Sequence, residues 1–254
     1  MIECRGLCAG YKKKEVLHDI SFTVPKGTVI AAVGKNGSGK STLAACLLGV
    51  LPLRAGSICL NGKPLPQYTR QELARMVSFT PQNLPAPAVS VEELIGFGRA
   101  PYTGISGRLS PEDKAAVEKA AALCGMTELL ERMVTGLSGG ERQRAYLAMA
   151  LAQEAPVMVL DEPSASLDIG ARSQFLQLLQ RLARETGRTV VVITHDLSDA
   201  VTLADHLLVL EEGRAVYTGP AGEDAAAETL ERVFSVRRHV FEEDGQQFTI
   251  FTAK

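Results

Sequence analysis

The sequence predicts an α/β fold in which an N-terminal antiparallel β region precedes a core of parallel strands, with a helical subdomain inserted into that core. Apolar runs of the kind buried in parallel sheets lie at residues 28–33, 157–160 and 189–194. Residues 20–24 alternate apolar and polar side chains, which is typical of a half-buried strand. Asn61-Gly62 follows a short apolar stretch and predicts a tight hairpin.

Helical patterns fill the middle of the chain. Ser110-Pro111 combines a capping residue with a proline at the first helical position, so a helix is expected to start there. Two more helices are expected at residues 139–153 and 169–186, the second ended by Gly187. We therefore predict one domain in two lobes: a catalytic α/β lobe of residues 1–82 and 155–254, and a helical lobe of residues 83–154.

The composition argues against several classes of protein. The chain has 254 residues, a net charge of −2 and five scattered cysteines without a CxxC pair. Neither a nucleic-acid partner nor a disulfide framework or zinc site is therefore expected. The longest apolar run, residues 43–53, is interrupted by Pro52 and is too short to cross a bilayer. Because no signal-peptide pattern is visible either, we expect the chain to remain in the cytoplasm.

A phosphate-binding loop is the strongest local signal. Residues 34–41 fit the pattern GxxxxGK[ST], between a predicted strand and a predicted helix. The glycines let backbone N–H groups converge on phosphates, and the helix N-terminus adds its positive dipole. Lys40 would reach the β- and γ-phosphates of a nucleotide, and the Ser41 hydroxyl would hold Mg²⁺. The predicted nucleotide contacts here are Gly34, Lys35, Asn36, Gly37, Ser38, Gly39, Lys40, Ser41 and Thr42.

Two adjacent acids complement this loop. Asp161 ends the apolar run at residues 157–160, which places it at the carboxyl edge of the predicted sheet, where ligands of α/β proteins bind. There Asp161 would bind Mg²⁺, as the acidic residue that usually accompanies a P-loop does. Glu162 is the candidate to position or deprotonate the attacking water.

A second anion site is predicted at the start of the helix at residues 139–153. Residues 137–144 read LSGGERQR, so a serine hydroxyl and free N–H groups lie at a helix N-terminus. This motif stands shortly before the VMVLDEP segment of residues 157–163. In this order the sequence resembles the ABC ATPases, for which LSGGE-type residues are the signature motif. The resemblance covers nearly the whole chain and implies a P-loop NTPase core of the ABC type that hydrolyses ATP with Mg²⁺.

Other residues match functional positions of that family, and the resemblance implies their roles. Tyr11 matches the aromatic side chain that stacks on adenine, although a half-buried strand tyrosine is an alternative. Gln82 matches the Q-loop glutamine, which contacts Mg²⁺ and the attacking water, and His195 matches the switch histidine that bonds the γ-phosphate. The remaining nucleotide contacts implied by the resemblance are Ser138, Gly139, Gly140 and, in the D-loop, Asp168.

The chain departs from the usual family pattern at two positions. Lys35 stands in the P-loop where proline is usual, and Ser164 begins the D-loop where threonine is common. Neither change removes a catalytic group, so both are expected to tune activity rather than abolish it.

The resemblance also implies partners. In ABC ATPases, Ser138 and Gly140 of one subunit would close over ATP held by the P-loop of another. The resemblance therefore implies a head-to-tail dimer with two ATP molecules at its interface, and we expect it to be a homodimer. Integral membrane permease subunits would hold the dimer at the cytoplasmic face of the cell membrane. An extracytoplasmic substrate-binding protein would be an indirect partner.

The segment from residue 83 to residue 107 is where such subunits meet a membrane protein. Its GR-x-P-Y element, residues 98–102, is similar to that of importer ATPases for iron–siderophore complexes, haem and cobalamin. Alternatively, Gly98-Arg99 is only a helix end with a cationic cap. A soluble ABC ATPase without a transport role, such as a partner in iron–sulfur cluster assembly, stays open. A metabolic kinase or GTPase is excluded, because neither class explains the LSGGERQR segment.

Overall fold

The computed structural model describes residues 1–103, 107–243 and 246–254. These residues form two compact units. The first combines residues 1–68 with residues 189–254, and the second consists of residues 69–188. The predicted lobes have other boundaries and stay a prediction.

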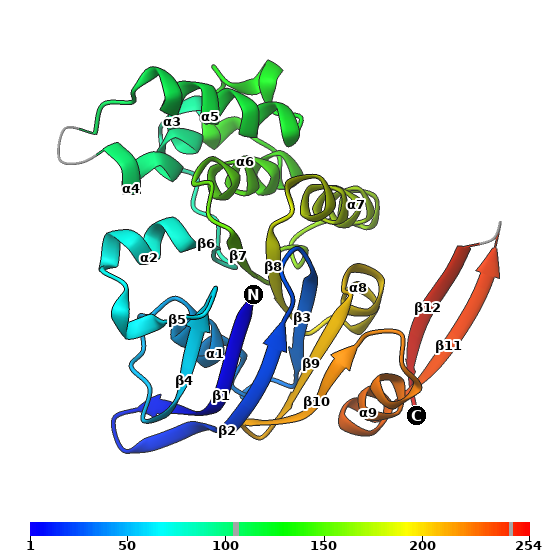
Figure 1. The fold of residues 1–254 in the computed structure, drawn as a ribbon. Coiled ribbons are helices and arrows are strands. Elements are labelled where there is room, and N and C mark those ends of the chain that lie inside the picture. Colours follow the sequence, from blue (N-terminus) through cyan, green and yellow to red (C-terminus); the bar gives the residue numbers. More distant parts are fainter. Residues whose placement is uncertain (104–106, 244–245) are drawn as a thin grey trace. The chain divides into compact units, whose positions relative to one another are not determined.

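Most of the described residues of the first unit belong to two sheets and to the helices α1 (Lys40–Leu47), α8 (Leu197–Leu203) and α9 (Asp224–Phe234) (Figure 1). One sheet has the order β2-β1-β4-β5 and is antiparallel. Its strands are β1 (Ile2–Tyr11), β2 (Lys14–Val24), β4 (Ala55–Leu60) and β5 (Lys63–Pro64), followed by the short 3-10 helix η1 (Leu65–Gln67). This confirms the predicted N-terminal antiparallel region and the hairpin at Asn61-Gly62.

The other sheet of this unit has the strand order β10-β9-β3-β8. Strands β8 and β9 both run parallel to β3, whereas β10 is antiparallel to β9. The strands are β3 (Val29–Gly34), β8 (Thr189–Thr194), β9 (His206–Glu211) and β10 (Arg214–Pro220). All residues of β3 and β8 are buried, as expected for parallel strands covered on both faces.

Helices cover both sides of β3. Helix α1 (Lys40–Leu47) contacts β1 and β2 as well as β3 and β8, and so packs between the two sheets. Helices α8 (Leu197–Leu203) and α9 (Asp224–Phe234) share an apolar cluster with β3 and β9. A C-terminal hairpin of β11 (Val236–Glu243) and β12 (Gln246–Ala253) adds Val236 and Phe251 to the edge of this cluster.

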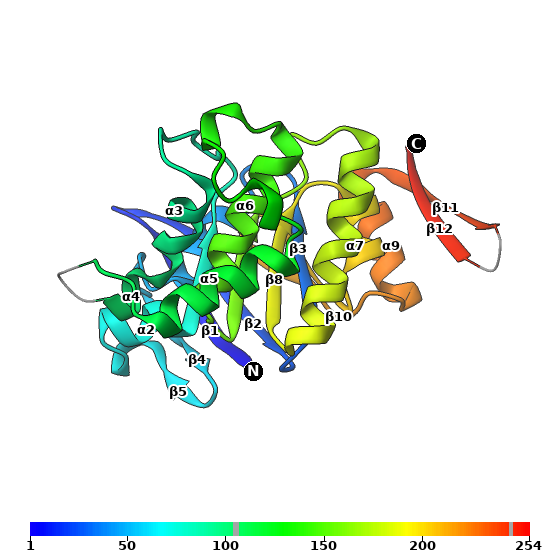
Figure 2. The ribbon, with the colours of Figure 1, turned by 90° about the horizontal axis from the view of Figure 1, so that it is seen from above.

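Helices dominate the second unit, which also contains the parallel strand pair β6 (Val77–Thr80) and β7 (Val157–Asp161). Helices α5 (Pro111–Leu123) and α6 (Gly139–Ala152) lie side by side (Figures 1 and 2). The remaining helices are α2 (Arg70–Met76), α3 (Val91–Gly96), η2 (Phe97–Arg99), α4 (Ala100–Thr103), η3 (Thr127–Leu129), η4 (Val134–Gly136) and α7 (Ile169–Thr186).

Local capping explains where these helices begin and end. Ser110 accepts a hydrogen bond from the Asp113 N–H while the Asp113 carboxylate accepts one from the Ser110 N–H, so α5 starts at the predicted residue. Helix α7 ends at Gly187, which adopts a left-handed φ of 63°. The cap residues in the sequence therefore specify both boundaries.

The described residues contain no helix that combines the length and the apolar character needed to cross a bilayer. All five cysteines carry free thiols. Burial raises the pKa of Cys46 to about 11 and that of Cys124 to about 12. These thiols are therefore protonated at neutral pH and act as small apolar core residues.

Candidate functional site

The predicted phosphate cradle is a loop between the end of β3 and the start of α1, in the strand–loop–helix arrangement that the sequence predicts (Figure 1). Gly37 and Gly39 adopt φ angles of 82° and 105°, which other residues rarely reach. A side chain on Gly34 would place its Cβ 2.3 Å from the Ser38 Oγ and 2.5 Å from the Leu210 oxygen. The glycines are therefore needed for both the turn and its close packing.

Polar groups of this loop converge at the N-terminus of α1. The Lys40 Nζ is buried, with 8% of the residue exposed, and donates hydrogen bonds to the carbonyls of Gly34 at 2.6 Å and Lys35 at 3.3 Å. The Ser38 hydroxyl is also buried, and it has no hydrogen-bond partner in the described part of the chain. An ammonium, an unpaired hydroxyl and the free N–H groups of a helix N-terminus fit a bound phosphate.

The phosphate loop is also held by the turn between β9 and β10, a contact that was not predicted from the sequence. The Gly213 N–H donates to the Ser38 carbonyl at 3.2 Å, and the Gly213 carbonyl accepts from the His18 N–H at 2.8 Å. Gly213 has a φ of 75°, and a Cβ there would lie 1.9 Å from the Val16 carbonyl oxygen. The turn between β9 and β10 thus ties β2 to the phosphate loop. Its only signal in the sequence is a Glu-Glu-Gly turn.

The structure brings His195 to the same edge of the sheet as the phosphate loop. Strand β8 pairs in parallel with β3 so that Thr194 lies opposite Val33, and each strand then enters its loop. Asp196 accepts a hydrogen bond from the Asp199 N–H and caps α8, which fixes the chain just after His195. The predicted switch histidine therefore follows the strand next to the one that carries the cradle.

Tyr11 ends β1 with 52% of its surface exposed. Its hairpin flanks the cradle, because a Cβ on Gly39 would lie 2.4 Å from a methyl carbon of Leu17 in β2. An exposed aromatic ring beside the phosphate loop suits stacking on a flat ligand better than the alternative of a half-buried strand tyrosine.

In the second unit, three predicted residues share one sheet edge. Strands β6 and β7 are parallel with Thr80 opposite Leu160. Asp161 is the last residue of β7, Glu162 follows it, and Gln82 comes two residues after β6. Glu162 has a φ of 48°, a left-handed conformation that costs non-glycine residues about 1–2 kcal/mol. Such strain tends to persist where function requires it.

The signature segment caps α6. The Ser138 hydroxyl accepts from the Glu141 N–H at 3.3 Å and donates to the Glu141 carboxylate at 2.8 Å, while the Ser138 N–H bonds the same carboxylate. These bonds, first from the backbone and then from the side chain of Ser138, lower the pKa of Glu141. Ser138 is therefore an N-cap residue in this structure, and its predicted role as a nucleotide contact stays a prediction.

Asp168 also caps a helix. Its carboxylate accepts from the Ala171 N–H at 2.9 Å at the start of α7. The start of α6 lies next to this segment, since a Cβ on Gly140 would sit 3.6 Å from the Ala171 Cβ. The structure thus brings the signature and D-loop segments together within one unit.

The GR-x-P-Y element is internal to the second unit. Arg99 is 5% exposed and donates to Asp113 at 2.8 Å, to Glu154 at 2.7 Å and to the Ala152 carbonyl at 2.7 Å. Its guanidinium lies 3.9 Å from the centre of the Tyr102 ring. Because Ala152 ends α6, Arg99 is a buried cationic cap, which favours the structural alternative for this element.

Gly98 packs directly against α6, because a Cβ there would lie 2.1 Å from the Met149 carbonyl oxygen. Phe97, one residue earlier, is 55% exposed. Residues 104–106 of the predicted membrane-partner segment lie outside the described residues.

The fold and these motifs define an ATP-binding cassette. The chain belongs to the ABC transporter family, whose pattern matches residues 17–165. It is therefore a nucleotide-binding ATPase.

Similar proteins narrow this class. The chain is 40% identical over 232 residues to the ferric enterobactin transport ATP-binding protein of Escherichia coli (strain K12), covering 91% of this chain and 86% of that protein. It is 36% identical over 228 residues to the iron(3+)-hydroxamate import ATP-binding protein of Bacillus subtilis (strain 168), covering 89% and 85%. A solved ABC transporter assigned to the metal-chelate type, in an inward-facing conformation, matches with a TM-score of 0.86 at 28% identity, covering 99% and 96%.

Proposed function

We propose that this chain is the ATP-hydrolysing subunit of a membrane importer for a metal chelate, of the iron–siderophore, haem or cobalamin type. The observation that carries the proposal is the similarity, over about nine-tenths of the chain, to ATP-binding proteins named for import of ferric siderophores. The alternative, a soluble ABC ATPase without a transport role, has no such support.

The phosphate loop would bind the nucleotide. Backbone N–H groups at the start of α1 and the unpaired Ser38 hydroxyl would donate to the phosphates, and Lys40 would add a positive charge. Tyr11 would stack on the adenine. Residues Gly34 to Thr42, with Lys35 in the position usual for proline, make up this part of the proposed site.

Mg²⁺ would be held by oxygen donors, the type it prefers: the Ser41 hydroxyl, the Asp161 carboxylate and the Gln82 amide. When bound, the ion neutralises charge that develops on the phosphates. Glu162 would accept a hydrogen bond from the attacking water and orient its oxygen toward the γ-phosphorus. As that oxygen bonds to phosphorus, the water passes a proton to Glu162 and the bond to the bridging oxygen breaks, which leaves ADP and phosphate. His195 would donate a hydrogen bond to the γ-phosphate.

A second copy of the chain would complete the site. Each chain has one phosphate loop and one signature segment, and we propose that Ser138, Gly139 and Gly140 of one copy cover ATP bound to the other, with Asp168 near the same interface. Closure would exclude water and add donors around the γ-phosphate. Product release would then open the dimer, and this cycle would drive the permease.

The membrane partner would dock on the segment from residue 83 to residue 107. Because Arg99 is buried in ion pairs, the exposed Phe97 is the better candidate in this segment for direct contact with a permease. Docking there would hold the ATPase at the cytoplasmic face of the membrane. An extracytoplasmic substrate-binding protein would deliver the chelate.

The test is to express tagged Glu162→Gln in the native cell, trap it with ATP and identify the proteins that co-purify from solubilised membranes. The matched control carries Lys40→Ala in addition and is expected to lose nucleotide and the trapped complex. Recovery of a multi-spanning membrane protein only with the first variant supports the proposal. Recovery of soluble proteins alone would refute the importer and leave the ATPase.

A further inference from the structure

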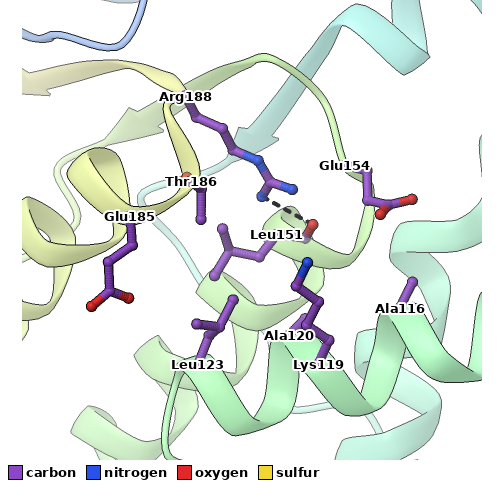
Figure 3. A pocket seen from close by; sticks show the side chains of 9 residues that line it. All are labelled: Ala116, Lys119, Ala120, Leu123, Leu151, Glu154, Glu185, Thr186 and Arg188. Carbon is purple, nitrogen blue, oxygen red and sulfur yellow. Dashed lines mark hydrogen bonds between the residues drawn. The ribbon is translucent and has the colours of Figure 1, made fainter.

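A pocket of about 290 Å³ lies in the second unit, between α5 and the C-terminal ends of α6 and α7 (Figure 3). Its floor is apolar, and its rim carries two cations and two acids. The lining residues are Ala116, Lys119, Ala120, Leu123, Leu151, Glu154, Glu185, Thr186 and Arg188. The volume is at the lower end of the range for small-molecule sites, roughly 300–1,000 Å³, so a small molecule fits it better than a peptide.

Both acids on the rim have cationic partners outside the pocket. Glu154 pairs with Arg99 at 2.7 Å, and Glu185 lies 4.0 Å from Arg181. In Figure 3 the two carboxylates point toward opposite sides, away from the centre of the pocket. Neither carboxylate is therefore ion-paired with a cation of the pocket, and only the charge of Glu154 acts on Arg188 from a longer distance.

The two cations, by contrast, form no ion pair among the described residues, and Glu154 acts on Arg188 only through its charge at longer range. The Arg188 guanidinium donates one hydrogen bond, to the Leu151 carbonyl at 3.0 Å. Lys119 makes no side-chain hydrogen bond or ion pair within the described chain. Figure 3 shows the nitrogen ends of both side chains pointing toward the Leu151 oxygen at the middle of the pocket.

Partial burial makes this arrangement costly. Desolvation lowers the pKa of Arg188, so its charged form loses hydration that a single carbonyl does not replace. A guanidinium offers five N–H donors, and a carboxylate or phosphate is the group that matches its fork. An anion at this position would satisfy the remaining donors of Arg188 and approach the Lys119 ammonium.

We propose that this pocket binds a small organic anion, with a carboxylate or phosphate between Arg188 and Lys119 and an apolar part over Leu123 and Leu151. The site is separate from the proposed nucleotide contacts of the same unit. The signature segment begins α6, whereas the pocket surrounds its other end, and 14 helical residues span about 21 Å. Such a ligand would contact α5 and the C-terminal ends of α6 and α7 at the same time.

The experiment measures binding of hexanoate to the full chain by titration calorimetry. The protein is saturated with ADP and Mg²⁺ so that the phosphate cradle does not compete for the probe. Hexylammonium, with the same tail and the opposite charge, reports the sign of the site. The variants are Lys119→Gln and Arg188→Gln, and the control is Lys114→Gln, an exposed lysine on α5 that does not line the pocket.

Hexanoate is expected to bind the wild-type chain and Lys114→Gln with equal affinity. Each pocket variant should bind hexanoate at least about tenfold more weakly, and hexylammonium should not bind. Lys119 is exposed, so its substitution tests the site even if Arg188→Gln fails to fold. Absence of saturable hexanoate binding, or equal affinity in wild type and Lys119→Gln, would overturn the proposal. Hexylammonium binding as tight as that of hexanoate would overturn it as well.

Discussion

Replacing Arg99 by methionine tests whether the GR-x-P-Y element is a structural clasp. Methionine keeps the unbranched stem and removes the guanidinium. The change removes the hydrogen bonds to Asp113, Glu154 and the Ala152 carbonyl, at 2.7–2.8 Å, and the contact with the Tyr102 ring. Every one of these partners lies in the second unit, so the loss falls on one compact body.

The pairs contribute unequally. The Glu154 side chain is 50% exposed, so its ion pair contributes about 0–1 kcal/mol. The Asp113 side chain is 8% exposed, and an uncompensated buried charge costs about 3–5 kcal/mol. Because the Asp113 carboxylate keeps the Ser110 N–H as a partner, we expect the lower end. Arg99→Met should therefore lower the free energy of unfolding by about 3 kcal/mol.

Urea unfolding followed by circular dichroism measures this loss, with Glu154→Ala as the control for the exposed pair. The double variant Arg99→Met with Asp113→Asn should be more stable than the sum of the two single losses predicts, because it leaves no unpaired carboxylate. A loss below about 1 kcal/mol for Arg99→Met, as for a surface pair, would refute the reasoning. So would equal losses for Arg99→Met and Glu154→Ala.

Three further predictions concern separate features. Gly213→Ala should weaken ATP binding about tenfold in a fluorescent-nucleotide titration, because the new Cβ would clash with the Val16 carbonyl and the shifted turn would disturb the hydrogen bond to the Ser38 carbonyl; unchanged affinity would show that this hydrogen bond is dispensable. The Arg99 hydrogen bond lowers the pKa of folded Asp113, so its stabilisation is present above the ordinary carboxyl pKa of about 4 and is lost as pH falls through the folded value. The stability difference between wild type and Asp113→Asn should accordingly shrink in acid, and a constant difference would contradict this. Tyr11→Ala should weaken ATP binding about tenfold while Tyr11→Phe preserves it, if ring stacking is the contact; equal losses would instead implicate the hydroxyl.

Local signals in the sequence predict much of the fold. Ser110 and Gly187 mark helix ends because caps act within one turn, and the observed boundaries of α5 and α7 follow them. Helices α2 and α8, of seven residues each, are not evident in advance. Two turns carry too little periodicity to distinguish a helix from a loop.

The candidate site likewise contains one part that the sequence predicts and other parts that it does not. The phosphate loop has a pattern whose strand and helix flanks are themselves readable, and the structure confirms both. The support from Gly213 joins residues about 175 positions apart, and no local pattern encodes that distance. Likewise, the partners of Arg99 lie 14 and 55 residues away, so its burial emerges only from packing.

The cap at Ser138 changes how mutants of the signature segment should be interpreted. Alanine there would remove a hydroxyl that holds the first turn of α6, at a cost of about 1 kcal/mol. A drop in ATPase rate could then come from a frayed helix start as well as from a lost nucleotide contact. Ser138→Asp keeps a strong capping group but introduces a negative charge where phosphate would approach. If the two variants differ in helix stability but lose the same turnover, the loss of turnover comes from the missing nucleotide contact. If turnover changes in step with helix stability, the loss comes from the weakened start of α6.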